Sequence, residues 1–203
     1  DLDCFRPRTS ATTEFHYEVL VVGSVSHHKN GLCVIEALKV LKDDRNLNFT
    51  LTWVGKIVKD IEERRRYYEA MEEKIESYGL KDVWKWKSPT QSIHQLMNQF
   101  DCLILASVTE GLPNVVCEAL SSGLPVIISD VLDHPILVKE EKRGFTFDPN
   151  NPRDLALKIA KFYQLESKKI SEMKKESRYY AEDNFRLSEM VNKYDILFKH
   201  LIH

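Results

Sequence analysis

The stretch DCLILASVTEGLPNVVCEALSSGLPVIISD (residues 101–130) holds two short apolar runs with an amphipathic segment between them. The runs at residues 101–107 and 124–130 have near-continuous apolar centres, which predict strands buried on both faces. Between them, apolar residues recur at helical spacing from Pro113, a residue favoured in a first helical turn, to Gly123, which ends the helix. A strand, a helix and a second strand in this order predict a parallel sheet covered by helices.

The same alternation continues on both sides of this stretch. Further strand-like runs occupy residues 17–23, 48–55, 82–87 and 144–147. Helical patterns occupy residues 30–44, 60–78, 92–100, 134–140, 152–165, 169–185 and 186–202. The order predicts an α/β fold with a doubly wound, mostly parallel sheet of six strands, followed by C-terminal helices.

Two of the predicted helices carry apolar stripes that supply candidate core residues. In the long charged helix, from about residue 60 to 78, the stripe consists of Ile61, Tyr68, Met71, Ile75 and Tyr78. In the helix that begins at Pro113 it consists of Leu112, Val115, Val116, Ala119 and Leu120. The charged helix also contains ERRR at residues 63–66, but the flanking acidic residues favour a solvated surface helix over a nucleic-acid site.

The composition restricts the classes of partner. The chain has 203 residues and a formal net charge of -2, so no global positive field favours nucleic acid or an anionic membrane. Its four cysteines have neither a CxxC pair nor metal-ligand spacing, and three of them fall in apolar runs, which favours a reduced, cytoplasmic chain. No apolar stretch approaches the roughly 18 residues that a membrane helix needs.

The loop GSVSHHKNG, residues 23–31, follows the first predicted strand and leads into a helix. Ligands of doubly wound sheets bind beyond the carboxyl ends of the strands, where this loop lies. Free backbone N–H groups at a helix start favour an anion, and Lys29 adds a positive charge. The spacing matches neither a dinucleotide-binding GxGxxG nor a P-loop. A plain strand-to-helix turn of small residues is the alternative interpretation.

The adjacent histidines of this loop, His27 and His28, raise the possibility of a metal site. Neighbouring side chains on a turn seldom converge on one ion, and no carboxylate or cysteine lies close to them in the sequence. The pattern therefore does not favour a metal.

Two glutamates accompany the helix that begins at Pro113. Glu110 lies in the loop before the helix, and Glu118 falls off the apolar stripe, on the side that it shares with Asn114. Both carboxylates can therefore reach one crevice, where their oxygens would accept hydrogen bonds from paired hydroxyl groups of a ribose or a hexose. The alternative is that they are ordinary solvated acids near a helix N-terminus, where negative charge is stabilising.

These segments together resemble a known family. The stretch EGLPNVVCEALSSGLPVIISD (residues 110–130) resembles the E-x7-E region of the family-four (group 1) glycosyltransferases. VLVVGSVSHHKNGLCVIEAL (residues 19–38) resembles the first loop and helix of their donor domain. FDCLILAS (residues 100–107) and RGFTFDPNNPRDLALKIAKF (residues 143–162) resemble the segments on either side of the motif. The resemblance covers about residues 1–165, in order.

This resemblance implies a Rossmann-like C-terminal half of a two-domain GT-B enzyme, which binds a nucleoside-diphosphate sugar without a metal or other cofactor. Glu118 would hold the ribose hydroxyls and Lys29 would contact the diphosphate. Glu110 would face the sugar, which makes Glu110 and Lys29 the candidate catalytic residues. The other candidates for substrate binding are Gly23, Ser24, Gly111, Leu112, Pro113 and Asn114.

The chain departs from the family pattern in two places. Ser24 stands where the family usually has an arginine that pairs with the lysine on the diphosphate. A charge-assisted hydrogen bond contributes roughly 1.5–3 kcal/mol, so its loss weakens donor binding unless another cation substitutes. His27, His28 and Lys56 are candidates by position. After the second strand, WVGKI (residues 53–57) lacks a second glycine that the family often has.

The resemblance also implies an organisation and a function for the chain. Residues 1–15 are expected to be a remnant of an inter-domain linker, residues 16–165 the nucleotide-sugar-binding domain, and residues 166–203 C-terminal helices. The expected activity is that of a retaining, hexosyltransferase-type enzyme of polysaccharide or glycolipid synthesis. The partners would be the sugar donor and a missing N-terminal acceptor domain, with any membrane contact made through the full-length enzyme.

Without its N-terminal half the chain would bind donor weakly and transfer nothing. Three alternatives stay open at this point. The first is another GT-B chemistry, such as a nucleotide-sugar epimerase or a sugar phosphorylase. The second is a degenerate binding or regulatory module, which Ser24 suggests. The third is an unrelated α/β domain with solvated glutamates.

Overall fold

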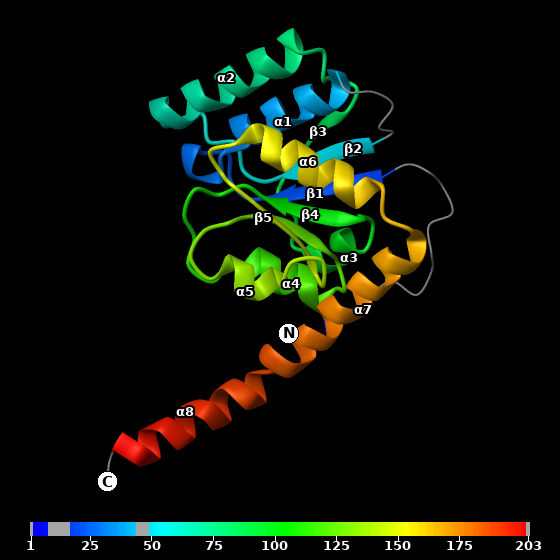
Figure 1. Ribbon diagram of the computed structural model, residues 1–203. Coiled ribbons are helices and arrows are strands. Elements are labelled where there is room, and N and C mark those ends of the chain that lie inside the picture. Colours follow the sequence, from blue (N-terminus) through cyan, green and yellow to red (C-terminus); the bar gives the residue numbers. More distant parts are fainter. Residues whose placement is uncertain (1, 8–16, 44–48, 202–203) are drawn as a thin grey trace.

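A computed structural model describes residues 2–7, 17–43 and 49–201 of the chain. Its sheet consists of β1 (Tyr17–Val22), β2 (Phe49–Val54), β3 (Trp84–Lys87), β4 (Cys102–Leu105), β5 (Val126–Ser129) and β6 (Gly144–Phe147). The strands lie in the order β3-β2-β1-β4-β5-β6, and every neighbouring pair is parallel (Figure 1). The predicted doubly wound sheet of six strands is confirmed.

Helices cover both faces of the sheet. The helices of the described residues are η1 (His27–Lys29), α1 (Gly31–Asp43), α2 (Glu62–Ser77), α3 (Ile93–Met97), α4 (Asn114–Ser121), α5 (His134–Val138), α6 (Pro152–Tyr163), α7 (Ser167–Asn184) and α8 (Leu187–Leu201). Helices α1, α2 and α6 lie on one face, and α3, α4 and α5 lie on the other (Figure 1). The parallel strands need these crossover helices, because a tight turn cannot join parallel neighbours.

Two hydrophobic clusters, one on each face, hold the layers together. Successive strand residues point to opposite faces, so Val19 and Val21 of β1 join the cluster with α1, α2 and α6, whereas Leu20 joins the cluster with α4 and α5. Burial of each such aliphatic side chain contributes about 1.5–3 kcal/mol. The near-continuous apolar runs in the sequence reflect this burial on both faces.

The apolar stripes of two helices differ in detail from those predicted. In α2 the buried side chains are those of Tyr67, Met71 and Ile75, four residues apart, while Tyr68 is only partly buried. Ile61 is 47% exposed because it precedes the first turn, in an extended conformation. Leu112 is 65% exposed for the same kind of reason, since it precedes the N-cap residue of α4. Each predicted stripe therefore began one or two residues before its helix.

The cysteines are structural. Cys33 and Cys102 are buried, and burial raises the pKa of the Cys33 thiol to about 12. Burial also raises the pKa of the partly buried Cys117 thiol to about 11. These three thiols therefore stay protonated at neutral pH, and a thiolate is the reactive form. Cys4 is exposed.

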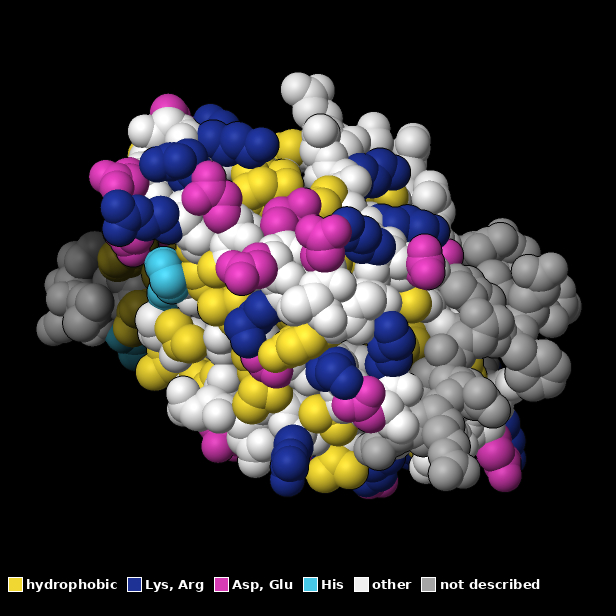
Figure 2. Space-filling model, turned by 90° about the horizontal axis from the view of Figure 1, so that it is seen from above, with side chains coloured by type: hydrophobic (Ala, Val, Ile, Leu, Met, Phe, Trp, Pro, Cys, Tyr) yellow, Lys and Arg dark blue, Asp and Glu magenta, His cyan; other side chains and the backbone are white. Residues whose placement is uncertain are grey.

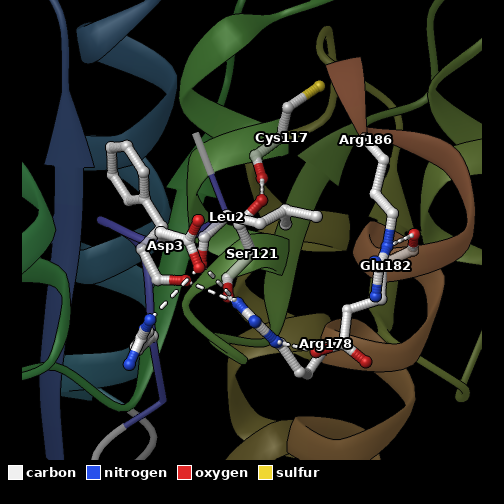
Figure 3. A network of polar contacts seen from close by, with 9 residues as sticks. Leu2, Asp3, Cys117, Ser121, Arg178, Glu182 and Arg186 are labelled. Atoms are coloured by element: carbon white, nitrogen blue, oxygen red, sulfur yellow. Dashed lines mark hydrogen bonds and ion pairs between the residues drawn. The ribbon is translucent and has the colours of Figure 1, made fainter. Parts of the chain in front are cut away.

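Helix α7 joins the N-terminal segment to the body of the domain through one arginine (Figure 3). The guanidinium of Arg178 donates hydrogen bonds to the carbonyl oxygens of Phe5 (2.5 Å) and Ser121 (2.7 Å), and to that of Leu2 (3.3 Å). Its Nε donates to the Glu182 carboxylate at 2.6 Å. The Arg178 side chain of α7 thus links residues 2–7 to the C-terminal end of α4 by hydrogen bonds.

Helix α8 extends away from the sheet and its covering helices (Figure 1). Its apolar side chains are more than half exposed at Val191, Tyr194, Ile196, Leu197 and Phe198. In the part of the chain that the structure describes, no helix combines the length and the apolar character needed to cross a membrane.

The outer face beside α2 is charged but of mixed sign. Figure 2 shows lysine and arginine side chains interspersed with aspartate and glutamate side chains across this face. Within α2, Arg65 pairs with Glu69, and Arg66 pairs with Glu62. The ERRR run therefore contributes to a mixed, solvated surface.

Candidate functional site

The candidate site lies at the carboxyl ends of β1 and β4, which are neighbours in the sheet. The loop at residues 23–30 follows β1, and the loop at residues 106–113 follows β4. The Val108 N–H donates a hydrogen bond to the His28 carbonyl at 3.1 Å, which joins the two loops. The order of the strands reverses between β1 and β4, and such a switch point forms a crevice in doubly wound sheets.

Gly23 fixes the start of the first loop. Its φ of 150° is a conformation that side chains rarely adopt, and its N–H donates to the Val54 carbonyl at 3.0 Å. Its own carbonyl accepts a hydrogen bond from Trp53 Nε1 at 2.8 Å. A Cβ at Gly23 would lie 3.0 Å from Cε of Lys29, so the lysine side chain passes directly over the glycine. The absence of a side chain at Gly23 therefore makes room for Lys29.

Lys29 and Glu110 form an ion pair across the crevice. Both side chains are largely buried, at 23% and 18% exposure. The Ser107 hydroxyl also donates to Glu110 Oε1 at 2.9 Å, and Ser129 Oγ holds the Ser107 carbonyl at 2.6 Å. Burial alone raises the pKa of the Glu110 carboxyl, but hydrogen bonds from Lys29 and Ser107 outweigh it and lower that pKa below its ordinary value. Glu110 is thus a firmly ionised, oriented carboxylate.

The environment of Glu118 shifts the pKa of its carboxyl in the opposite direction. Glu118 lies on α4, partly buried, and burial raises the pKa of its carboxyl above the ordinary value. Within residues 2–7, 17–43 and 49–201, no N–H or O–H group donates to its carboxylate, so its oxygens can accept hydrogen bonds from a ligand. A partly desolvated carboxylate lowers the stability of the fold when no hydrogen-bond donor compensates for its burial. Such a group is a candidate for ligand binding.

The two glutamates should therefore have opposite effects on stability, which Glu118→Gln and Glu110→Gln test as a matched pair. The folded-state pKa of Glu118 is raised, so its contribution to stability is lost as the pH rises through that pKa. We expect Glu118→Gln to raise the thermal midpoint of the ligand-free chain at neutral pH. The folded-state pKa of Glu110 is lowered, so its stabilisation is present at neutral pH and is lost as the pH falls through that pKa.

Glu110→Gln should accordingly lower the neutral-pH midpoint, because it weakens hydrogen bonds to a charged group that contribute about 1.5–3 kcal/mol before solvent screening is considered. Thermal unfolding of the three proteins at neutral and mildly acidic pH measures both effects. Equal loss of stability in the two variants would contradict the assigned environments.

The loop that precedes α4 is open on its ligand side. A Cβ added at Gly111 would meet no atom within 4 Å. Pro113 is buried and its carbonyl accepts the N–H groups of Val116 (2.9 Å) and Cys117 (3.2 Å). The helix begins at Asn114, one residue later than predicted, so the amides of its first turn point towards the crevice end of α4.

Comparison with known proteins assigns the chain to a family. The family model described as Glycosyl transferases group 1 matches residues 8–183. The chain belongs to this family. Its sequence is 27% identical over 201 residues to the putative colanic acid biosynthesis glycosyltransferase WcaL of Escherichia coli K12, covering 95% of this chain and 47% of that protein. The chain thus spans about half the length of this relative.

Solved structures of other proteins have the same fold. The C-terminal domain of the group 1 protein LpcC from Francisella tularensis superposes with a TM-score of 0.79 at 18% identity, covering 92% of this chain and 98% of that one. Anabaena HepE, in complex with UDP and glucose, superposes with a TM-score of 0.82 at 18% identity, covering 98% of this chain and 54% of that one. The chain therefore has the fold of this C-terminal domain, and the family match over residues 8–183 confirms the resemblance of the sequence to the group 1 glycosyltransferases.

The structure brings three of the predicted site residues of this glycosyltransferase domain together. Gly23, Lys29 and Glu110 are in direct proximity, and Ser24 is exposed beside them. His27 instead packs against Tyr67 of α2, with ring centroids 4.1 Å apart and the ring planes tilted by 48°. Among the described residues, no group of three His, Cys, Asp or Glu side chains is placed to hold a metal ion.

Sequence reasoning missed the residues that hold the site in place. Ser129 is the last residue of β5, and Ser107 lies in the loop after β4, at the end of the sheet that faces the crevice. That position was a usable signal for Ser107, which lies two residues after the end of β4. Trp53 had no such signal, because its hydrogen bond to the Gly23 carbonyl crosses between neighbouring strands.

Proposed function

We propose that this chain is the donor-binding half of a retaining glycosyltransferase that moves a sugar from a UDP-sugar to an acceptor hydroxyl in polysaccharide or glycolipid synthesis. The observation that carries the proposal is the ion pair of Lys29 and Glu110 at the switch point of the sheet, next to the helix α4 that carries the partly buried Glu118. The complex of HepE with UDP and glucose supports a UDP-sugar as the donor. The name of WcaL, which refers to colanic acid biosynthesis, supports a role in polysaccharide synthesis.

In this proposal each charged residue has a separate task. Glu118 accepts the hydroxyls of the ribose, for which its carboxylate is available. Lys29 leaves or shares Glu110 and contacts the diphosphate. Glu110, with the amides of residues 111–114, then faces the sugar. Substrate binding thus exchanges an internal ion pair for two contacts with the donor.

The electrostatic requirement of the reaction is to stabilise the departing diphosphate. Lys29 and the backbone amides at the start of α4 supply preorganised positive charge at that place. In a retaining reaction the leaving phosphate and the acceptor hydroxyl meet on one face of the sugar. The acceptor would come from the N-terminal half of the longer enzyme, so we expect this chain alone to bind donor without transferring sugar. We place the full enzyme in the cytoplasm, with any membrane contact made by its other parts.

A thermal-shift series with UDP, GDP, ADP and CMP, followed by the corresponding sugars, tests the proposal. A ligand at 100 times its Kd stabilises a protein by about 2.7 kcal/mol, so UDP and UDP-sugars should raise the midpoint clearly. CMP is the matched control, because it carries a base and a ribose but only one phosphate. A folded chain that responds to none of these nucleotides would overturn the assignment.

A second candidate function is a degenerate binding or regulatory module. The neutral, exposed Ser24 favours it, because the loop after β1 then lacks one cation of the family pattern. Such a module would bind nucleotide weakly and would remain inactive even when joined to its N-terminal half.

A further inference from the structure

His134 is a completely buried histidine at the crevice end of the sheet. It is the first residue of α5, it follows β5, and it is 0% exposed. Its Nδ1 lies 2.8 Å from the carbonyl oxygen of Ser129, the last residue of β5. A carbonyl oxygen can only accept a hydrogen bond, so Nδ1 carries the hydrogen and donates it. The other ring nitrogen, Nε2, is buried without a hydrogen-bond partner among the described residues.

The unpaired Nε2 makes histidine a costly side chain for this interior position. A buried polar atom without a partner lowers the stability of the fold, because it has lost its hydrogen bonds to water. A phenylalanine ring would fill a similar space and would bury no such atom. What histidine adds at this position is therefore the Nδ1–H donor, whose acceptor is Ser129.

Ser129 belongs to the hydrogen bonds that support the candidate site. The last backbone pair of β4 and β5 is Leu105 with Ile128, so the two strands are no longer joined by their backbones beyond it. There the Ser129 hydroxyl donates to the Ser107 carbonyl at 2.6 Å, and both serines are 0% exposed. The Ser107 hydroxyl in turn donates to Glu110 Oε1 at 2.9 Å.

These contacts form a continuous path from α5 to the crevice. The path runs from His134 to Ser129 and on through Ser107 to Glu110. We propose that His134 is a positioning residue, which orients the Glu110 carboxylate through the two serines and thereby sets the grip of the crevice on the sugar of the donor. The contact with the sugar rests on the proposed function, whereas the orientation of the carboxylate does not.

His134→Phe tests the orientation in the ligand-free chain. It removes the Nδ1–H donor together with the unpaired Nε2 and keeps a ring in place, so we expect the thermal midpoint to change little. The pKa of the Glu110 carboxyl, followed by carbon-13 NMR during a pH titration, should rise towards its ordinary value. The reason is that the hydrogen bond from Ser107, which helps to lower this pKa, is loosened. Lys29 and His28 also lower it, and neither is altered by the substitution.

Two further variants separate this path from a general effect on the interior. His134→Asn supplies a side-chain N–H that can replace the Nδ1–H donor, so it should keep the pKa of Glu110 as in the unmodified chain. Tyr163→Phe is the matched control, because the Tyr163 hydroxyl is also buried without a partner among the described residues. Its ring packs against Tyr17, which begins β1 at the opposite end of the sheet, so this variant should leave the pKa of Glu110 unchanged. An unchanged pKa of Glu110 in His134→Phe would show that the inference is wrong.

Calorimetric titration with UDP-glucose and with UDP then measures the consequence for the donor. We expect His134→Phe to bind UDP-glucose about fivefold more weakly and UDP within about twofold of the unmodified chain, because UDP lacks the sugar that Glu110 faces. Unchanged affinity for UDP-glucose, or an equal loss for both nucleotides, would contradict the inference. If the unmodified chain binds neither nucleotide while His134→Phe still raises the pKa of Glu110, the proposed function fails but the positioning of Glu110 stands.

Discussion

Gly55→Ala is expected to prevent this chain from reaching its folded state. A Cβ at residue 55 would lie 1.8 Å from the carbonyl oxygen of Gly23, a distance that no packing rearrangement of side chains relieves. Neither backbone is free to move. Gly23 is held by hydrogen bonds to Val54 and from Trp53, and the Gly55 N–H donates to the Lys87 carbonyl at 3.0 Å. We expect the free energy of unfolding to fall by about 4 kcal/mol or more, a size that only severe changes such as backbone strain produce.

Gly111→Ala is the matched control for this substitution. Nothing lies within 4 Å of a Cβ at Gly111, so the same chemical change should alter the unfolding free energy by less than about 0.5 kcal/mol. Circular dichroism during thermal or urea unfolding measures both. A folded Gly55→Ala chain with an unchanged midpoint would show that the loops after β1 and β2 are not packed as described.

Glu118→Ala is expected to weaken nucleotide binding more than any other single carboxylate substitution in the crevice. In the proposed complex the carboxylate accepts hydrogen bonds from ribose hydroxyls, and hydrogen bonds to charged groups contribute about 1.5–3 kcal/mol. The affinity for UDP should therefore fall by roughly ten- to more than a hundredfold. The loss should not arise from unfolding, because burial of Glu118 costs the ligand-free fold stability.

Glu76→Ala provides a control for the change in net charge. Glu76 is an exposed carboxylate of α2 that pairs with Lys81, away from the crevice. Its removal alters the charge of the chain by the same amount and should leave UDP affinity within about twofold, because surface ion pairs contribute little. Similar losses of affinity in the two variants would assign the effect to long-range charge rather than to the ribose.

The topology of the fold could be predicted because burial on both faces leaves a strong pattern in the sequence. Runs such as CLIL in β4 and VIIS in β5 are wholly buried, and the helices between them alternate apolar and polar residues at helical spacing. The ends of the helices were less predictable. Ile61 and Leu112 continue the apolar spacing, but the chain before α2 and α4 is extended, and spacing alone does not report where a helix starts.

The sequence pointed to candidate residues for the site but not to the contacts between them. Position at strand ends and family resemblance pointed to Lys29 and Glu110, which are 81 residues apart in the sequence. Their ion pair, and the support of Glu110 by Ser107, depend on the order of strands in the sheet. The contact of the His27 ring with Tyr67 of α2 depends on the short η1 turn.

The central claim is that Glu118 recognises the ribose of a nucleotide donor in this crevice. Calorimetric titration of UDP and of 2′,3′-dideoxy-UDP into the unmodified chain and into Glu118→Ala tests it most directly. We predict that the unmodified chain binds UDP at least tenfold more tightly than the dideoxy analogue, and that Glu118→Ala binds both equally. If Glu118→Ala still distinguishes the two nucleotides as strongly as the unmodified chain does, Glu118 does not bind the ribose and the central claim is wrong.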